Sequence, residues 1–262
     1  MRDFYEHYYA AVNHSHSHAR FCERAFGRNL GQHGFADIAQ LDALIAAANL
    51  GPGQHALDLG CGNGMIAEYI SDQSSAQVTG LDYIPAAIRQ AQVRTAPKAE
   101  RLSFLVGDIN ALDLPSAAFD AILLIDTIYF SNDYRTTIRQ LVDALRPGGR
   151  LVFFYAYGWA PGMSIEDFPR ETLAPDQTPL ALALQANQLA FTTQDFTAED
   201  YRLAQLRKRV LTELKAALAD DGLQFIYENR MGEANGISRA VELGLHRRYL
   251  YRTHSSLPAA PC

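Results

Sequence analysis

A strand that ends in three closely spaced glycines constrains this chain most. Residues 56–59 form a mainly apolar run that suits a buried parallel strand. Gly60, Gly62 and Gly64 follow, and glycine lets the backbone turn sharply and approach a ligand because it has no Cβ. Residues 65–70 then continue with helical spacing. The sequence therefore predicts a turn that presents the free N–H groups of a helix N-terminus to a bound molecule.

Two acidic residues narrow the kind of molecule that this turn could bind. Asp82 ends a second apolar segment, at about the distance expected for a ribose-binding acid. Asp58, at the end of the first strand, is a poor neighbour for a pyrophosphate and a good one for an ammonium group. A dinucleotide fingerprint would also need glycine at position 65, where Met65 stands. The pattern therefore disfavours a nicotinamide-dependent oxidoreductase.

Composition excludes several broad classes of protein. The chain has 262 residues, of which 48% are hydrophobic and 20% charged, as in a soluble α/β domain with additions. Its net charge of −6 argues against nucleic acid as a partner. Three scattered cysteines are too few for a disulfide framework. The N-terminal residues lack the apolar core of a secretory signal and no run is long enough to span a membrane, so we expect a cytoplasmic protein with no membrane partner.

The order of elements predicts a doubly wound, mostly parallel, seven-stranded α/β sheet with an N-terminal helical cap and an insertion after the fifth strand. Helices alternate with the first five strands, and two further strands follow near the C-terminus. The expected strands are residues 55–59, 77–81, 102–106, 119–125, 150–156, 223–228 and 248–253.

Glycine and proline mark the expected boundaries along the chain. Gly51, Pro52 and Gly53 separate a helical cap or lid, residues 1–50, from a sheet domain, residues 51–254. Several prolines interrupt residues 157–197, which we interpret as the insertion. We expect residues 255–262 to be a disordered tail.

Asp58, Gly60, Gly62 and Gly64 spell D-x-G-x-G-x-G, which resembles motif I of class I (Rossmann-like) S-adenosylmethionine-dependent methyltransferases. Three further segments match the family in order: Gly107-Asp108-Ile109 at the end of the third strand, Phe119-Asp120 at the start of the fourth, and Leu145-Arg146-Pro147-Gly148-Gly149 before the fifth. The resemblance covers residues 54–156. It implies a small-molecule methyltransferase that uses S-adenosylmethionine.

The resemblance also implies how each part of the cofactor is bound. The glycine turn and the helix N-terminus would take its carboxylate, Asp58 its ammonium group and Asp82 both ribose hydroxyls. Tyr83 would pack on the adenine, while Asp108 and the Ile109 N–H would bind its edge. The expected cofactor-binding residues are Asp58, Gly60, Gly62, Gly64, Asp82, Tyr83, Asp108, Ile109 and Ile125.

The acceptor side is expected at the end of the fourth strand, under the cap. Asp126 could bind a cationic amine or act as a base. His33 is the other candidate base, because its ordinary pKa suits neutral pH. The glycines around His33 resemble a turn that lies over the active site in tocopherol, sterol and sarcosine methyltransferases. The catalytic candidates are Tyr129, His33 and Asp126, and the substrate-binding candidates are Tyr5, Tyr9, Thr127 and Trp159.

The predicted function is transfer of the methyl group of S-adenosylmethionine to a nitrogen, oxygen or carbon atom of a small molecule. Residues 125–128 lack the N/D-P-P-Y segment of nucleic-acid amino-methyltransferases. The histidines near residue 16 lack a carboxylate that would complete a site, so no metal is expected. Cyclisation of the cofactor, transfer of its aminocarboxypropyl arm, and a non-catalytic binding module remain alternatives. We expect a monomer or a homodimer.

Overall fold

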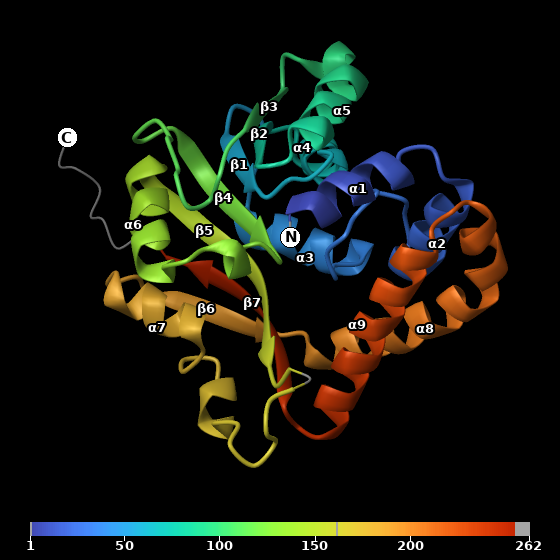
Figure 1. The fold of residues 1–262 in the computed structure, drawn as a ribbon. Coiled ribbons are helices and arrows are strands. Elements are labelled where there is room, and N and C mark those ends of the chain that lie inside the picture. Colours follow the sequence, from blue (N-terminus) through green and yellow to red (C-terminus); the bar gives the residue numbers. More distant parts are fainter. Residues whose placement is uncertain (1, 161, 255–262) are drawn as a thin grey trace.

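A seven-stranded sheet forms the centre of the computed structural model, which describes residues 2–160 and 162–254 (Figure 1). The strand order is β3-β2-β1-β4-β5-β7-β6. The first five strands run parallel, whereas β7 pairs antiparallel with β5 and with β6. The strands are β1 (His55–Leu59), β2 (Gln77–Asp82), β3 (Leu102–Val106), β4 (Phe119–Ile125), β5 (Leu145–Gly158), β6 (Phe191–Asp195) and β7 (His246–Thr253). The predicted fold class is confirmed, while the expected tail at residues 255–262 lies outside the described residues.

Helices cover both faces of the sheet, because successive side chains of each strand point to opposite sides. In β5, Phe153 packs with α6 and α7 in one apolar cluster, and Phe154 packs with α3 and α4 in the other. The helices are α1 (Arg2–Val12), α2 (His16–Phe26), α3 (Ile38–Ala48), α4 (Met65–Ser74), α5 (Pro85–Thr95), α6 (Tyr134–Ala144), α7 (Pro179–Ala186), α8 (Thr197–Asp220) and α9 (Gln224–Glu242).

A separate helical layer forms beside the sheet from the two ends of the chain. The α8–α9 hairpin lies against α1 and α2, although almost the whole sheet separates them in sequence (Figure 1). Tyr8, Phe21, Leu211 and Ile226 come from these four helices and share one buried apolar cluster. The N-terminal helices are therefore packed on the C-terminal hairpin, and α1 also contacts α5.

One expected strand near the C-terminus is wrong, and one strand was not expected. Residues 223–228 begin α9 instead of forming a strand. The buried side chains of α9 include Ile226, Arg230, Ala234 and Ser238, which repeat every four residues along one helical face. The strand that completes the set of seven is β6. It lies inside the expected insertion and pairs with β7 at the edge of the sheet.

Candidate functional site

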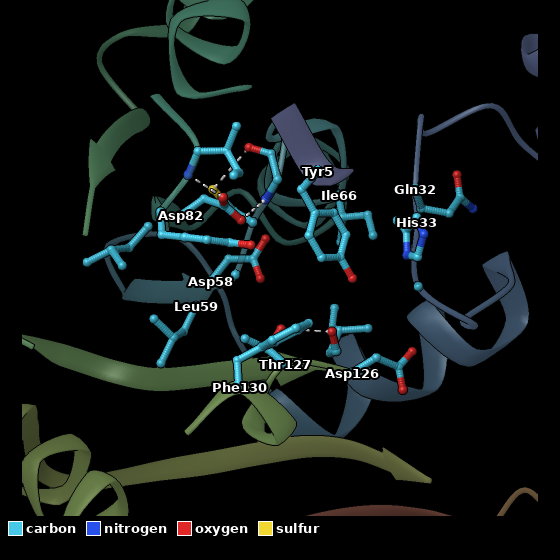
Figure 2. A pocket seen from close by; sticks show the side chains of 18 of the residues that line it. Tyr5, Gln32, His33, Asp58, Leu59, Ile66, Asp82, Asp126, Thr127 and Phe130 are labelled. Atoms are coloured by element: carbon cyan, nitrogen blue, oxygen red, sulfur yellow. Dashed lines mark hydrogen bonds between the residues drawn. The ribbon is translucent and has the colours of Figure 1, made fainter. Parts of the chain in front are cut away.

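A cavity of about 380 Å³ opens where β1, β2 and β4 end, beneath α1 and the turn around His33. Ligands of open α/β sheets bind at this edge. Figure 2 shows Asp58 and Asp82 on one side, Tyr5 across the middle and His33 beyond it. The lining includes most of the residues expected from sequence: the cofactor candidates Asp58, Gly60, Gly62, Asp82, Tyr83, Asp108, Ile109 and Ile125, and the acceptor-side candidates Tyr5, Tyr9, His33, Asp126, Thr127 and Tyr129.

The glycine turn forms the floor of the cavity. Gly60 and Gly62 have φ values of 82° and 55°, in the left-handed region that glycine adopts readily. A Cβ on Gly62 would overlap the Tyr9 hydroxyl, so α1 can approach the turn only over a glycine. Gly64 does not line the cavity. A Cβ there would overlap Phe104, so Gly64 also lets α4 pack closely against the sheet, and its contact with the cofactor stays a prediction.

The N-terminus of α4 follows this turn and has no side-chain cap. Gly64 occupies the cap position and offers no hydrogen-bonding side chain. Uncapped N–H groups and the helix dipole favour a bound anion such as a carboxylate. This is the chemistry that the sequence pattern predicted for the turn.

Asp82 connects the ends of the first two strands. Its Oδ2 accepts a hydrogen bond from the Gly62 N–H at 2.9 Å, and its Oδ1 accepts one from the Ile84 N–H at 2.9 Å. Burial raises the pKa of Asp82 although these backbone N–H groups lower it. Each carboxylate oxygen has a second lone pair, so Asp82 can still accept hydrogen bonds from a ligand.

Asp58 is the most unusual acid of the site. Its side chain is buried, and its Oδ2 has no hydrogen-bond partner among the described residues. Burial, and then the nearby charge of Asp82, raise the pKa of Asp58 to about 7. A buried carboxylate without a partner is costly, and a cation would offset that cost. The residues present therefore fit a ligand with an ammonium group at this point.

Tyr5 closes the cavity from above. Its ring centroid lies 5.9 Å from that of Phe130, 6.4 Å from that of Tyr83 and 5.0 Å from that of His33, all in edge-to-face geometry. Burial, with the nearby charge of Glu233, raises the pKa of Tyr5 to about 12, so its phenol stays protonated. Tyr5 thus joins α1 to the loops that follow β2 and β4.

His33 lines the cavity, and its Nε2 is a buried atom. Its ring packs edge-to-face on Tyr8, with centroids 4.8 Å apart, and its Nε2 has no partner in residues 2–160 and 162–254. Burial, and then the cations Arg230 and Arg207, hold the pKa of His33 well below its ordinary value. The imidazole is therefore neutral near pH 7 and can accept a hydrogen bond.

Asp126 forms a buried ion pair with Arg248, and its assignment as a base is therefore corrected. The Arg248 guanidinium donates to both carboxylate oxygens, at 2.6 and 3.0 Å, and the Phe35 N–H donates to Oδ2 at 2.9 Å. The Arg248 and Asp126 side chains are only 0% and 4% exposed. Asp126 thus holds the His33 turn and β7 against the end of β4.

Tyr129, Thr127 and Trp159 each make a hydrogen bond within the protein. The Tyr129 hydroxyl accepts a hydrogen bond from the Ala156 N–H of β5, and Thr127 Oγ1 donates to the Ile125 carbonyl at 3.0 Å. Trp159 does not line the cavity. Its indole N–H donates to the Met163 carbonyl at 2.8 Å and its ring packs on a different cluster, so its assignment to the substrate site is corrected.

Sequence reasoning missed three fully buried arginines behind the cavity, Arg207, Arg230 and Arg248. Arg207 stands in a run of three basic residues, 207–209, which is typical of a solvated helix face. Its position four residues after Leu203 and four before Leu211 places it in the apolar stripe, and that register was the available signal. Glu233, which also lines the cavity, accepts a hydrogen bond from Arg207 at 2.7 Å and was likewise missed.

Comparison with known proteins identifies the central part of the chain. Residues 57–153 match the Methyltransferase domain family. The O-methyltransferase resE of Aspergillus sclerotiorum is 37% identical over 103 residues, 38% of each chain. The 27-O-demethylrifamycin SV methyltransferase of Amycolatopsis mediterranei is 30% identical over 145 residues, which cover 51% of this chain and 53% of that protein. The matched segment thus spans about two-fifths to half the length of these relatives.

Solved structures extend the similarity of the fold to nearly the whole chain. Phosphoethanolamine N-methyltransferase 2 of Haemonchus contortus, in complex with phosphomonomethylethanolamine and S-adenosylhomocysteine, superposes with a TM-score of 0.76 over 97% of this chain and 60% of its own, at 16% identity. The cyclopropane synthase MmaA2 of Mycobacterium tuberculosis superposes with a TM-score of 0.70 over 94% of this chain and 98% of its own, at 18% identity. In the part of the chain that the structure describes, no helix is long and apolar enough to cross a membrane. Residues 57–153 thus match a methyltransferase domain, and the fold of nearly the whole chain is similar to that of these solved structures.

Proposed function

We propose that this protein transfers the methyl group of S-adenosylmethionine to a small-molecule acceptor. The observation that carries the proposal is the buried Asp58 carboxylate, unpartnered among the described residues and placed beside a left-handed glycine turn and an uncapped helix N-terminus. The amino-acid end of S-adenosylmethionine needs both features, because an anion binds its ammonium group and free N–H groups bind its carboxylate.

The cofactor end of the cavity offers one group for each part of S-adenosylmethionine. Asp58 would bind the ammonium group, the uncapped N-terminus of α4 the carboxylate, and Asp82 the ribose hydroxyls. The N–H groups of Gly60 and Gly62 donate to Leu81 and Asp82, so these glycines would let the ligand approach closely and would not bind it. Tyr83, Asp108 and Ile109 would lie against the adenine, and Ile125, at the end of β4, also lines the cavity. The cofactor supplies a methyl group already activated as a sulfonium, so the protein mainly has to align the acceptor and exclude water.

The acceptor end is closed by side chains of the cap. Tyr5 and Tyr9 exclude water from above, and Thr127 and Tyr129 form the wall at the end of β4. His33 lines this end, and its neutral imidazole would accept a hydrogen bond from an acceptor that loses a proton on methylation. An oxygen acceptor agrees with the names of several relatives, which are O-methyltransferases. We further propose a cytoplasmic monomer or homodimer that does not act on nucleic acid, in keeping with the net charge of −6.

Calorimetric titration with S-adenosylmethionine and S-adenosylhomocysteine tests the cofactor assignment. We expect micromolar binding, on the order of −8 kcal/mol, and weaker binding to Asp82→Ala than to the control Asp113→Ala, whose side chain is exposed. Absence of binding, or tighter binding of NADH, would contradict the proposal. Product analysis separates the alternatives, because methyl transfer leaves S-adenosylhomocysteine whereas cyclisation or aminocarboxypropyl transfer leaves methylthioadenosine. Cofactor binding without turnover of any acceptor would favour a non-catalytic module.

A further inference from the structure

Glu233 of α9 brings a fixed carboxylate to the acceptor end of the cavity. Its Oε2 accepts from the Arg207 guanidinium at 2.7 Å and lies 3.5 Å from Arg230 Nη1. The Glu233 side chain is 20% exposed, whereas those of Arg207 and Arg230 are 1% and 0% exposed. None of the hydrogen bonds among the described residues uses Glu233 Oε1. One oxygen is thus held from behind, and the other is available at the lining.

Glu233 also separates the cavity from two buried positive charges. Burial lowers the pKa of Arg207 although Glu233 raises it, and the Nε atoms of Arg207 and Arg230 have no partner in the described chain. These guanidiniums would attract any anion that reached them. Because the Glu233 carboxylate stands between them and the cavity, an entering ligand meets a negative charge first.

The rest of the lining offers little positive charge to an anionic ligand. Among the described lining residues, Arg2 is the only arginine or lysine, and its Nε donates to Glu6 at 3.0 Å in an exposed pair. His33 is neutral near pH 7 because burial and the arginines lower its pKa. The walls around it are aromatic, formed by Tyr5, Phe35, Tyr129 and Phe130.

We infer that the acceptor is an uncharged or cationic molecule that donates a hydrogen bond, from a hydroxyl or ammonium group, to Glu233 and rests its apolar part on the aromatic walls. Glu233 is then a specificity-determining residue that excludes phosphate and carboxylate acceptors by like-charge repulsion. The inference rests on the proposed function and names its substrate class. It separates this chain from its structural neighbour of Haemonchus contortus, which was solved with phosphomonomethylethanolamine.

Three small probes that share a phenyl ring test the inference: 2-phenylethylamine, 2-phenylethanol and phenylacetate, which end in an ammonium, a hydroxyl and a carboxylate group. Each is titrated by ligand-observed NMR into the protein saturated with S-adenosylhomocysteine. We expect the amine and the alcohol to bind and phenylacetate to bind at least about tenfold more weakly. Phenylacetate binding as tightly as the other two, or no binding by any probe, would overturn the inference.

Glu233→Gln isolates the charge while keeping the shape of the side chain. With the carboxylate removed, Arg207 and Arg230 lack their shared counter-charge, and phenylacetate should become the tightest probe. The control is Glu228→Gln, an exposed carboxylate on the same helix, which should leave the order unchanged. An unchanged order in Glu233→Gln would overturn the inference. If this variant does not fold, the order of probe affinities measured for the wild-type protein alone decides whether the inference stands.

The initial titration with S-adenosylhomocysteine separates the two proposals. If it does not bind, the proposed function and the inference both fail. If it binds but the probes do not discriminate by charge, the inference fails and the cofactor assignment stands.

Discussion

Arg230 of α9 donates a hydrogen bond to the phenol oxygen of Tyr8 in α1 at 3.1 Å, across 222 residues of sequence. The same guanidinium donates to the backbone carbonyls of Gln32, at 2.7 Å, and His33. One buried side chain therefore binds both parts of the roof of the cavity, the helix that carries Tyr5 and the turn that carries His33. The position of the roof depends on α9.

Replacing Arg230 with methionine should weaken this connection strongly. The substitution keeps an unbranched side chain but removes the donors to Tyr8, Gln32 and His33. We expect the free energy of unfolding to fall by about 3–5 kcal/mol, as when one partner of a buried polar network is removed. Urea denaturation measures the loss. The matched control is Arg239→Met, at an exposed position on the same helix; an equal loss in both variants would show that the buried contacts contribute no special stability.

Asp58 should make both stability and cofactor binding depend on pH. Burial raises the pKa of Asp58 from 3.8 to about 7. Between these values the folded protein holds a proton that the unfolded chain has released, so the free energy of unfolding falls as pH rises through this range and levels off above it. Asp58→Asn should remove this slope and be more stable than the wild-type protein at pH 8 by roughly 2–4 kcal/mol. Urea denaturation at several pH values checks both expectations.

The same proton should leave when the cofactor binds. An ammonium group beside Asp58 favours the carboxylate, so S-adenosylmethionine should bind more tightly as pH rises from 5 to about 7, with little change above. Calorimetry in two buffers of different ionisation enthalpy counts the protons released at pH 6.5. Release of as many protons by Asp58→Asn as by the wild-type protein would mean that another group is responsible.

His33→Ala and Tyr129→Phe should distinguish a residue that acts on the methyl acceptor from one that only supports the wall of the cavity. We expect His33→Ala to lower the single-turnover rate by about 10²-fold or more, with cofactor affinity unchanged. Because the pKa of His33 is held well below its ordinary value, the wild-type rate should show no ionisation near pH 6.5. Tyr129→Phe removes the acceptor of the Ala156 N–H in a contact that is partly exposed, so we expect a loss of about 0.5–1.5 kcal/mol in stability and a nearly unchanged rate. Equal rates in both variants would move the acceptor away from His33.

The part of the site that sequence predicts well is the part built from neighbouring residues. The glycine turn, Asp58 and Asp82 lie within one strand–helix–strand segment, so their spacing already fixes where they meet. The acceptor end depends on pairs that are distant in sequence. The contact of Asp126 with Arg248 spans 122 residues, and no local pattern connects the two.

The wrong element assignments have a similar cause. Residues 223–228 are rich in aromatic and branched side chains that suit a strand, but packing against α8 overrides that preference. β6 is short, polar and partly exposed, so it carries no apolar run that could mark it as a strand. Local propensity therefore fails where another segment of the chain decides which face is buried.

The link between α1 and α9 also has a consequence for synthesis on the ribosome. Tyr8 emerges early, and Arg230 is added 222 residues later. At translation rates of about 5–20 residues per second, this interval lasts roughly 10–45 s. During that time the apolar faces of α1 and α2 lack the hairpin that covers them in the finished protein. The N-terminal helices thus expose apolar surface until the hairpin is made, and the roof of the cavity is completed only after Arg230 has been added.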